Sequence, residues 1–255
     1  MPQFLFAPIK FLSDLFLTLI LWSYFLGAGA LSLVLYSAVF IFSKDRESSF
    51  QFLSCYFYKG FFNLAALIVP GLKISIDEGI DKISSSVIIC NHISYLDPIL
   101  LISIIKKQKT IIKGTFFKVP VFGWIVKNSG YIPSSSSDIF NLKNSEMISE
   151  LKDYIKSGGN IFIFPEGTRS KDGSLGRFKK GAFSIAKITG ASITVLQIKN
   201  TGRLFIPGRF LFNTLADNEI SVKVLKTFLP DYSSAEFSAG ALSEEVRGIF
   251  LKTVD

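Results

Sequence analysis

The sequence predicts an α/β protein in which a mostly parallel sheet is flanked by helices, with a hydrophobic membrane anchor at its N-terminal end. Three observations support this prediction in a chain of 255 residues, which is long enough for one sizeable core. After residue 70, short β-branched runs alternate with helix-like segments, as is typical of parallel sheets. Several runs are apolar on both faces, which indicates strands covered by helices on both sides. Before residue 44, charged residues almost disappear.

The N-terminal apolar run is the first element. Residues 15–43 are 29 consecutive uncharged residues. As a helix they would be roughly 43 Å long at ~1.5 Å per residue, against a hydrocarbon core of about 30 Å. One tilted helix fits this length, and so do two shorter helices broken near residues 27–29. Residues 28–30 also resemble a signal-peptide cleavage site, but apolar sequence continues to Phe42, so we expect membrane attachment rather than cleavage.

The charge pattern separates the anchor from the rest of the chain. The net charge of +8 lies downstream of residue 43, and residues 98–137 and 173–216 contain no acidic side chain. Such surfaces attract the phosphates of nucleic acid, anionic lipid or small molecules, although a solvated basic face without a specific partner is the alternative. We disfavour nucleic acid because the basic stretches lack interleaved aromatic recognition motifs. We expect an anionic membrane surface as partner, at the cytoplasmic face of the cell membrane.

After the anchor (1–43), we expect an amphipathic connector (44–70) and then the catalytic domain (71–255). The predicted strands of that domain are residues 72–76, 86–90, 110–112, 160–164, 193–198 and 220–228. The predicted helices are residues 97–106, 121–127, 138–157, 180–189 and 243–253. Ser243, followed by two glutamates, is the expected N-terminal cap of the last helix. Residues 134–137, four serines, read as a loop.

The first cluster of polar residues follows the strand at 86–90. His92, the only histidine in the chain, is followed five residues later by Asp97, and Asn91 and Ser94 lie beside them. A carboxylate can hold one imidazole nitrogen protonated and leave the other free to accept a proton, so the pair can act as a base with its orienter. A capping Asn, a surface His and an Asp at a helix start explain the same spacing. Ser94 and the buried Cys90 are poorer candidates for a nucleophile.

The second cluster follows the strand at 160–164. Arg169 offers a planar fork for a phosphate, Gly167 allows close backbone approach, and Thr168 adds a hydroxyl. Glu166 can accept from a substrate hydroxyl or hold Arg169, and Lys179 adds positive charge nearby. An ordinary turn with a surface ion pair is the alternative. Ligands bind at the carboxyl ends of strands in open α/β sheets, so both clusters are expected to face one site.

Together these motifs resemble the glycerolipid acyltransferase family, which includes the 1-acylglycerol-3-phosphate acyltransferases. The family carries an N-H-x-S-x-x-D block, present at residues 91–97, and an F-P-E-G-T-R-S block, present at 164–170. Lys113 and residues 120–124 are similar to the family's intervening segment. The resemblance extends from about residue 72 to 199.

The resemblance implies a reaction and roles for these residues. The sn-2 hydroxyl of 1-acylglycerol-3-phosphate would attack the thioester of acyl-CoA or acyl-carrier protein and give phosphatidic acid. His92 would be the general base and Asp97 its orienter. The acceptor's glycerol phosphate would be bound by Glu166, Gly167, Thr168 and Arg169, with help from Lys113 and Lys179. No metal and no cofactor beyond the acyl thioester is implied, and two cysteines with one histidine could not form a zinc site.

Two departures from the family pattern bear on the acceptor. Residues 131–137 lack the arginine that often contributes to phosphate binding there, and residues 193–196 lack a usual proline. Another lysophospholipid or glycerol 3-phosphate is therefore the alternative acceptor. A membrane-bound lipid hydrolase that uses His92 to activate water is an alternative of another class, and a non-catalytic lipid-binding protein is a third.

Overall fold

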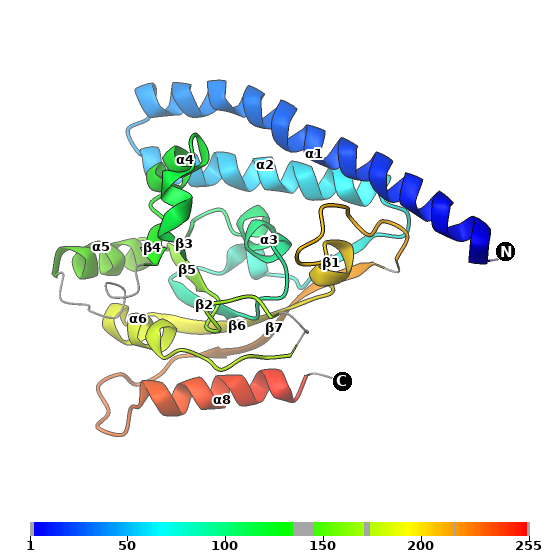
Figure 1. Cartoon of the computed structure of the whole chain (residues 1–255). Helices are drawn as coiled ribbons and strands as arrows, with labels where there is room; N and C mark the ends of the chain where they lie inside the picture. The colour runs from blue at the N-terminus through cyan, green and yellow to red at the C-terminus, as the bar shows by residue number, and fades with distance from the viewer. Residues whose placement is uncertain (1–2, 135–144, 171–173, 217, 254–255) are drawn as a thin grey trace.

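A seven-stranded mixed sheet forms the centre of the computed structural model, which describes residues 3–134, 145–170, 174–216 and 218–253 (Figure 1). The strand order is β1-β7-β6-β2-β5-β3-β4. Neighbouring strands are parallel except β6 and β7, which are antiparallel. The strands are β1 (Lys73–Ile76), β2 (Ser86–Cys90), β3 (Gln108–Lys113), β4 (Ile132–Ser134), β5 (Asn160–Ile163), β6 (Ser192–Lys199) and β7 (Glu219–Phe228).

Helices cover both faces of this sheet, so the predicted fold class is confirmed. Side chains alternate along β2, and this alternation creates two cores. Ile88 packs with the helices on the side of α2, and Val87 packs with those on the side of α8. The helices are α1 (Gln3–Phe42), α2 (Arg46–Ile68), α3 (Leu96–Ile104), α4 (Phe122–Asn128), α5 (Ser145–Lys156), α6 (Gly181–Thr189), α7 (Thr201–Leu204) and α8 (Ala239–Leu251).

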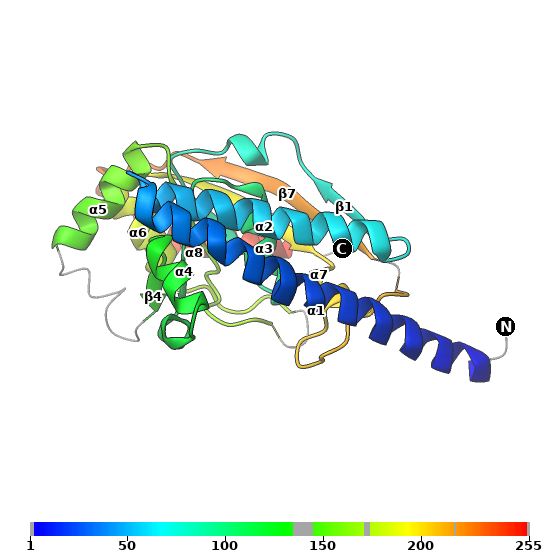
Figure 2. The same ribbon diagram turned by 90° about the horizontal axis from the view of Figure 1, so that it is seen from above.

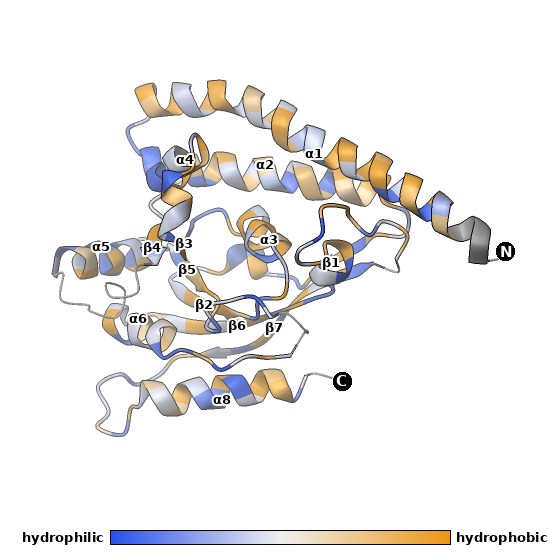
Figure 3. Ribbon diagram, viewed as in Figure 1, coloured by the Kyte–Doolittle hydropathy of each residue, from blue (hydrophilic) through white to orange (hydrophobic). Residues whose placement is uncertain are grey.

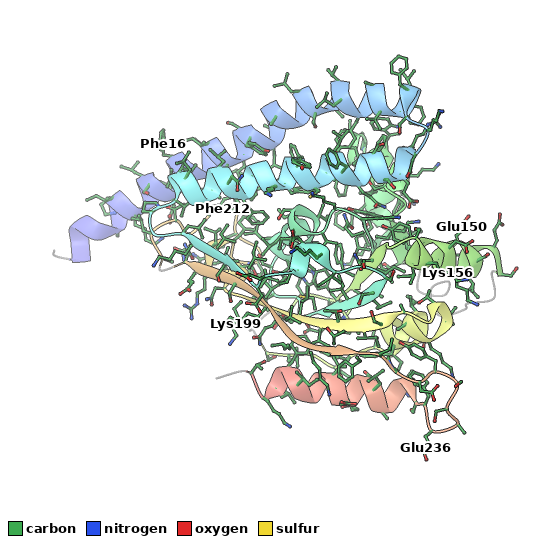
Figure 4. The ribbon with its side chains drawn as sticks, turned by 180° about the vertical axis from the view of Figure 1, so that it is seen from behind. Phe16, Glu150, Lys156, Lys199, Phe212 and Glu236 are labelled. Carbon is green, nitrogen blue, oxygen red and sulfur yellow. The ribbon has the colours of Figure 1, made fainter. Side chains whose placement is uncertain are left out.

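The N-terminal apolar run is one continuous helix, α1, with no break at Gly27 or Gly29. Helix α2, which occupies the predicted connector, returns along α1, and the N-terminal end of α1 projects beyond the sheet (Figure 2). By length and composition, α1 could span a membrane over Ala7–Phe42, and Figure 3 shows how apolar it is. Phe16 points away from the sheet and is 63% exposed, whereas Phe212 is buried on the inner side of α1 (Figure 4).

The last helix and one short strand differ most from the predictions. The last helix begins at Ala239, and Ser238 is its cap, accepting from the Ala241 amide at 3.3 Å. The prediction that Ser243 is the cap is wrong, because Ser243 lies inside the helix on the face that packs against the sheet with Val246. Strand β4, three residues long, was not predicted because its proline and serine resemble a loop. Residues 135–144, part of a predicted loop and helix, lie outside the described residues.

Candidate active site

The two predicted motifs meet at the carboxyl edge of the sheet. His92 follows β2, and Glu166 follows β5, which is the parallel neighbour of β2. The His92 amide donates to Glu166 Oε1 at 3.0 Å, and the Ser170 amide donates to the His92 carbonyl at 2.9 Å. Residues 74 positions apart in the chain are therefore joined through the backbone of the histidine itself.

His92 and Asp97 form a close pair. Their Nδ1 and Oδ2 atoms are 2.9 Å apart, and Asp97 is fully buried in the first turn of α3. Oδ2 also accepts from the amides of Ile93 and Ser94 at 2.6 and 2.7 Å, and Oδ1 accepts from the Thr201 hydroxyl at 2.5 Å. Because the Asp97 oxygens accept from all of these groups, the neutral imidazole that fits this arrangement carries its hydrogen on Nδ1, and Nε2 is the nitrogen left to accept a proton. The pair can therefore act as a base with its orienter.

An aromatic ring fixes the plane of the imidazole. Phe164, the residue that follows β5, stacks on His92 with ring centroids 4.2 Å apart and planes 21° apart. The ring is thus held at its edge by Asp97 and on its face by Phe164. The sequence interpretation assigned no role to Phe164 or Thr201. Both follow the carboxyl end of a strand, β5 and β6, and that position was the available signal.

The other residues of the first motif hold the backbone. Asn91 donates to the Ile198 carbonyl and accepts from the Ile198 amide, both at 2.8 Å, which ties the end of β2 to β6. Ser94 is fully buried and donates to the Phe205 carbonyl at 3.1 Å. Burial raises the pKa of the Cys90 thiol well above its usual value, and the charge of Asp97 raises it further. The Ser94 hydroxyl is buried and donates to a backbone carbonyl, and the Cys90 thiol is held in its protonated form. Ser94 and Cys90 are therefore not suited to act as nucleophiles.

Glu166 braces two backbone segments. Besides the His92 amide at Oε1, its Oε2 accepts from the Gly176 amide at 2.9 Å, and the residue is 8% exposed. Among the described residues, no ion pair joins Glu166 to Arg169. The carboxylate therefore connects the histidine to the loop before α6, which was not among the roles considered from the sequence.

A basic pocket of about 690 Å³ opens beside Glu166. Gly167 has a φ of +70°, and a Cβ atom there would lie 2.6 Å from the Lys179 ammonium, so glycine permits this close approach. Four cationic residues contribute to the lining, and its carboxylate, Glu166, already accepts from two backbone amides. The lining residues are Glu166, Thr168, Arg169, Ser170, Ser174, Gly176, Arg177, Phe178, Lys179 and Lys180.

This pocket is chemically suited to a phosphate group. Lys113 ends β3, two strands from β2, and is exposed rather than part of the pocket lining. In the chain as described, no three His, Cys, Asp or Glu side chains gather where they could hold a metal ion. The structure thus brings together His92, Asp97, Glu166 and the following residues to Arg169, with Lys179 beside them.

Comparisons with known proteins agree with this arrangement. The family model described as Acyltransferase matches residues 71–199. A chloroplastic 1-acyl-sn-glycerol-3-phosphate acyltransferase of Arabidopsis thaliana is 38% identical over 145 residues, 55% of this chain and 40% of that protein. The 1-acyl-sn-glycerol-3-phosphate acyltransferase of Borreliella burgdorferi is 32% identical over 152 residues, 58% of this chain and 60% of that one. The matched region thus spans roughly half the length of these relatives.

A solved structure shares the fold along almost the whole chain. The 1-acyl-sn-glycerophosphate acyltransferase PlsC of Thermotoga maritima superposes with a TM-score of 0.68 at 23% identity, covering 98% of both chains. The chain is thus an α/β protein whose mixed sheet carries a histidine–carboxylate pair beside a cationic pocket. Because the family model covers half of the sequence, this chain belongs to the acyltransferase family.

Proposed function

We propose that this chain is an enzyme that transfers a fatty acyl group from an acyl thioester to the sn-2 hydroxyl of 1-acylglycerol-3-phosphate, giving phosphatidic acid. The observation that carries the proposal is the junction of the two motifs. The His92–Asp97 pair is joined through Glu166 to a pocket with four cationic residues. A base and a phosphate pocket held by one carboxylate suit an acceptor that carries a hydroxyl and a phosphate on the same small backbone.

The reaction follows from these positions. His92 Nε2 takes the proton from the acceptor hydroxyl as the oxygen attacks the thioester carbonyl. Asp97 keeps Nδ1 protonated and stabilises the imidazolium that forms. The carbon–sulfur bond then breaks, and the imidazolium returns its proton to the leaving thiolate. The base is thereby regenerated, and an ester and a free thiol are the products.

The phosphate of the acceptor is bound by the basic pocket. Arg169 contributes a planar set of donors, and Thr168 adds its hydroxyl. Lys179 lines this pocket and adds positive charge around the phosphate, whereas Lys113, at the end of β3, lies outside the lining and contributes only to the basic surface of the domain. The donor is acyl-CoA or acyl-carrier protein, and the reaction uses no further cofactor.

Helix α1 gives the site access to its lipid. One face of α1 carries exposed apolar side chains such as Phe16, Leu26 and Leu31, and in water this face would have no favourable partner. The proposal places this face in the bilayer, with the basic domain on an anionic surface at the cytoplasmic side of the cell membrane.

A second acceptor class is supported by one observation. Residues 131–137 contain no arginine, so the phosphate contacts depend on the pocket after β5. Another lysophospholipid or glycerol 3-phosphate is therefore the alternative acceptor.

Product analysis tests the proposal. Purified full-length protein in mixed micelles is given labelled acyl-CoA or labelled acyl-carrier protein, with 1-acylglycerol-3-phosphate, other lysophospholipids or glycerol 3-phosphate in separate reactions. We expect labelled phosphatidic acid that depends on the lysophosphatidate. Free fatty acid with no acceptor-dependent product would identify a hydrolase instead. Product from a different acceptor alone would keep the transferase and overturn its substrate.

A further inference from the structure

The Arg169 guanidinium lies over an aromatic ring from the other motif. Its guanidinium carbon is 3.3 Å from the centroid of the Tyr95 ring. Tyr95 precedes α3 and lies between His92 and Asp97 in the chain, and its ring also contacts Phe205 at a centroid distance of 6.3 Å. The ring is half exposed, at 50%. The arginine of the second motif is therefore positioned by a residue inside the first.

One donor of this guanidinium has no hydrogen-bond partner within the part of the chain that the structure describes. Arg169 Nη1 is buried and has no hydrogen-bond partner in the structure. A buried donor without a partner is costly, and a cationic donor more so, unless an anion is bound to it. An aromatic face attracts a guanidinium without using any of its N–H groups. A carboxylate partner would have used those groups and neutralised the charge.

We propose that Tyr95 is a positioning residue, which holds the Arg169 guanidinium in the pocket with its N–H edge available to the phosphate of the acceptor. This inference rests on the proposed function, because it takes the bound anion to be the acceptor's phosphate. Tyr95 is three residues from His92 and two from Asp97. The ring therefore places the arginine that binds the phosphate beside the segment that carries the base.

The expected effects separate positioning from general support of the fold. In Tyr95→Leu, apolar bulk remains but the aromatic face is lost, and loss of the cation–π contact to this half-exposed ring corresponds to a fall in affinity of about 3- to 30-fold. We expect KM for the lysophosphatidate to rise by that factor, with kcat and KM for the acyl donor within about twofold of wild type. Tyr95→Phe keeps the face and restores wild-type values. Tyr95→Met is a second variant without a ring.

The experiment measures binding and turnover separately in full-length protein. Calorimetry in detergent micelles gives Kd for 1-acylglycerol-3-phosphate and for the matched monoacylglycerol, which lacks the phosphate. Tyr95→Leu should weaken binding of the phosphate-bearing lipid alone. In an Arg169→Ala background the same substitution should change Kd by less than about twofold, because the ring acts through the guanidinium.

Three results would overturn the inference. They are wild-type affinity in both Tyr95→Leu and Tyr95→Met, an unchanged effect of the substitution without Arg169, and equal binding of the two lipids by the wild-type protein. Failure of the proposed function looks different, because it is the absence of acyl transfer to the lysophosphatidate in turnover assays. Phosphate-dependent binding that needs Tyr95 would stand even then.

Discussion

Thr201 lies 104 positions after Asp97, and its hydroxyl donates to Asp97 Oδ1 from the start of α7. Thr201 is fully buried. Among the described contacts of the Asp97 carboxylate, two come from side chains, His92 and Thr201, and the others come from backbone amides. Because the carboxylate fixes which imidazole nitrogen carries the hydrogen, a residue that holds Asp97 also holds His92 in its working orientation.

Thr201→Val tests this contact at nearly constant volume. The substitution removes one hydrogen bond to a charged, buried acceptor, so we expect a loss of roughly 1.5–3 kcal/mol in the free energy of unfolding. We also expect kcat to fall while KM for the acceptor changes little. Thr201→Ser keeps the hydroxyl and is the matched control. If the valine variant matched wild type in both unfolding and kcat, Thr201 would have no part in holding Asp97.

Helix α1 is attached to the domain by polar contacts as well as by apolar ones. Asp14, 8% exposed, accepts from the Thr214 amide and hydroxyl, each at 2.7 Å, and forms an ion pair with Lys10. One turn further along, Thr18 accepts from the Phe212 amide at 2.9 Å. The segment from Phe205 to Thr214 that these residues contact also supports Ser94 through the Phe205 carbonyl. The helix is therefore part of the scaffold of the site.

Asp14→Leu separates packing from membrane attachment. The substitution makes α1 more apolar, so we expect flotation with phospholipid vesicles to be unchanged. It also leaves the Thr214 amide without its acceptor, at a cost of about 1–3 kcal/mol, and leaves the Thr214 hydroxyl with only the longer contact to Ser13 at 3.4 Å. The midpoint of thermal unfolding in micelles should therefore fall. Asp14→Asn retains an oxygen acceptor, so it should lower the midpoint of thermal unfolding by less. Unchanged thermal unfolding in the leucine variant would show that the contacts of Asp14 do not help to hold α1 on the domain.

At the scale of the whole molecule, two forces are expected to hold the protein at a membrane. The net charge of +8 favours an anionic surface, and the exposed apolar face of α1 favours the bilayer interior. High salt separates the two contributions, because the Debye length is only about 3 Å at 1 M ionic strength and the electrostatic attraction is then screened.

We expect the full chain to stay on neutral vesicles in 1 M NaCl, since apolar burial is not screened. Added anionic lipid should increase binding at low salt and have little effect at high salt. Co-sedimentation over a salt series measures both. Release from neutral vesicles by salt would contradict the proposed insertion of α1.

Much of this fold was predictable because its signals are local. The buried strands β2 and β5 are apolar runs bounded by polar motifs, and both appear in the structure within a residue of their predicted ends. The glutamates after Ser243 predict a cap there, but Leu242 and Ser243 are themselves buried on the inner face of α8, so the helix begins one turn earlier and is capped by Ser238. Patterns within a few residues cannot report that long-range packing.

The contacts of the site likewise divide into local ones, which the sequence predicts, and long-range ones, which it does not. His92 and Asp97 were found because they share one motif, and their side chains meet at 2.9 Å. The bridge from Glu166 to the His92 amide and the support from Thr201 depend on strand order, since β5 and β6 flank β2. Strand order arises from the packing of the whole sheet, so neither contact could be read from sequence spacing.

The central claim is that His92 is the base of an acyl transfer, and its removal tests that claim most directly. His92 is the only histidine in the chain, so His92→Ala leaves no imidazole. The measurement is the rate of phosphatidic acid formation by full-length protein, with Cys90→Ala as the matched control at the buried thiol. We predict a fall of about 10²-fold or more for His92→Ala, as for loss of a general base, with thermal unfolding retained and near-wild-type turnover in the control. A His92→Ala protein that forms product within a few-fold of the wild-type rate would contradict the account.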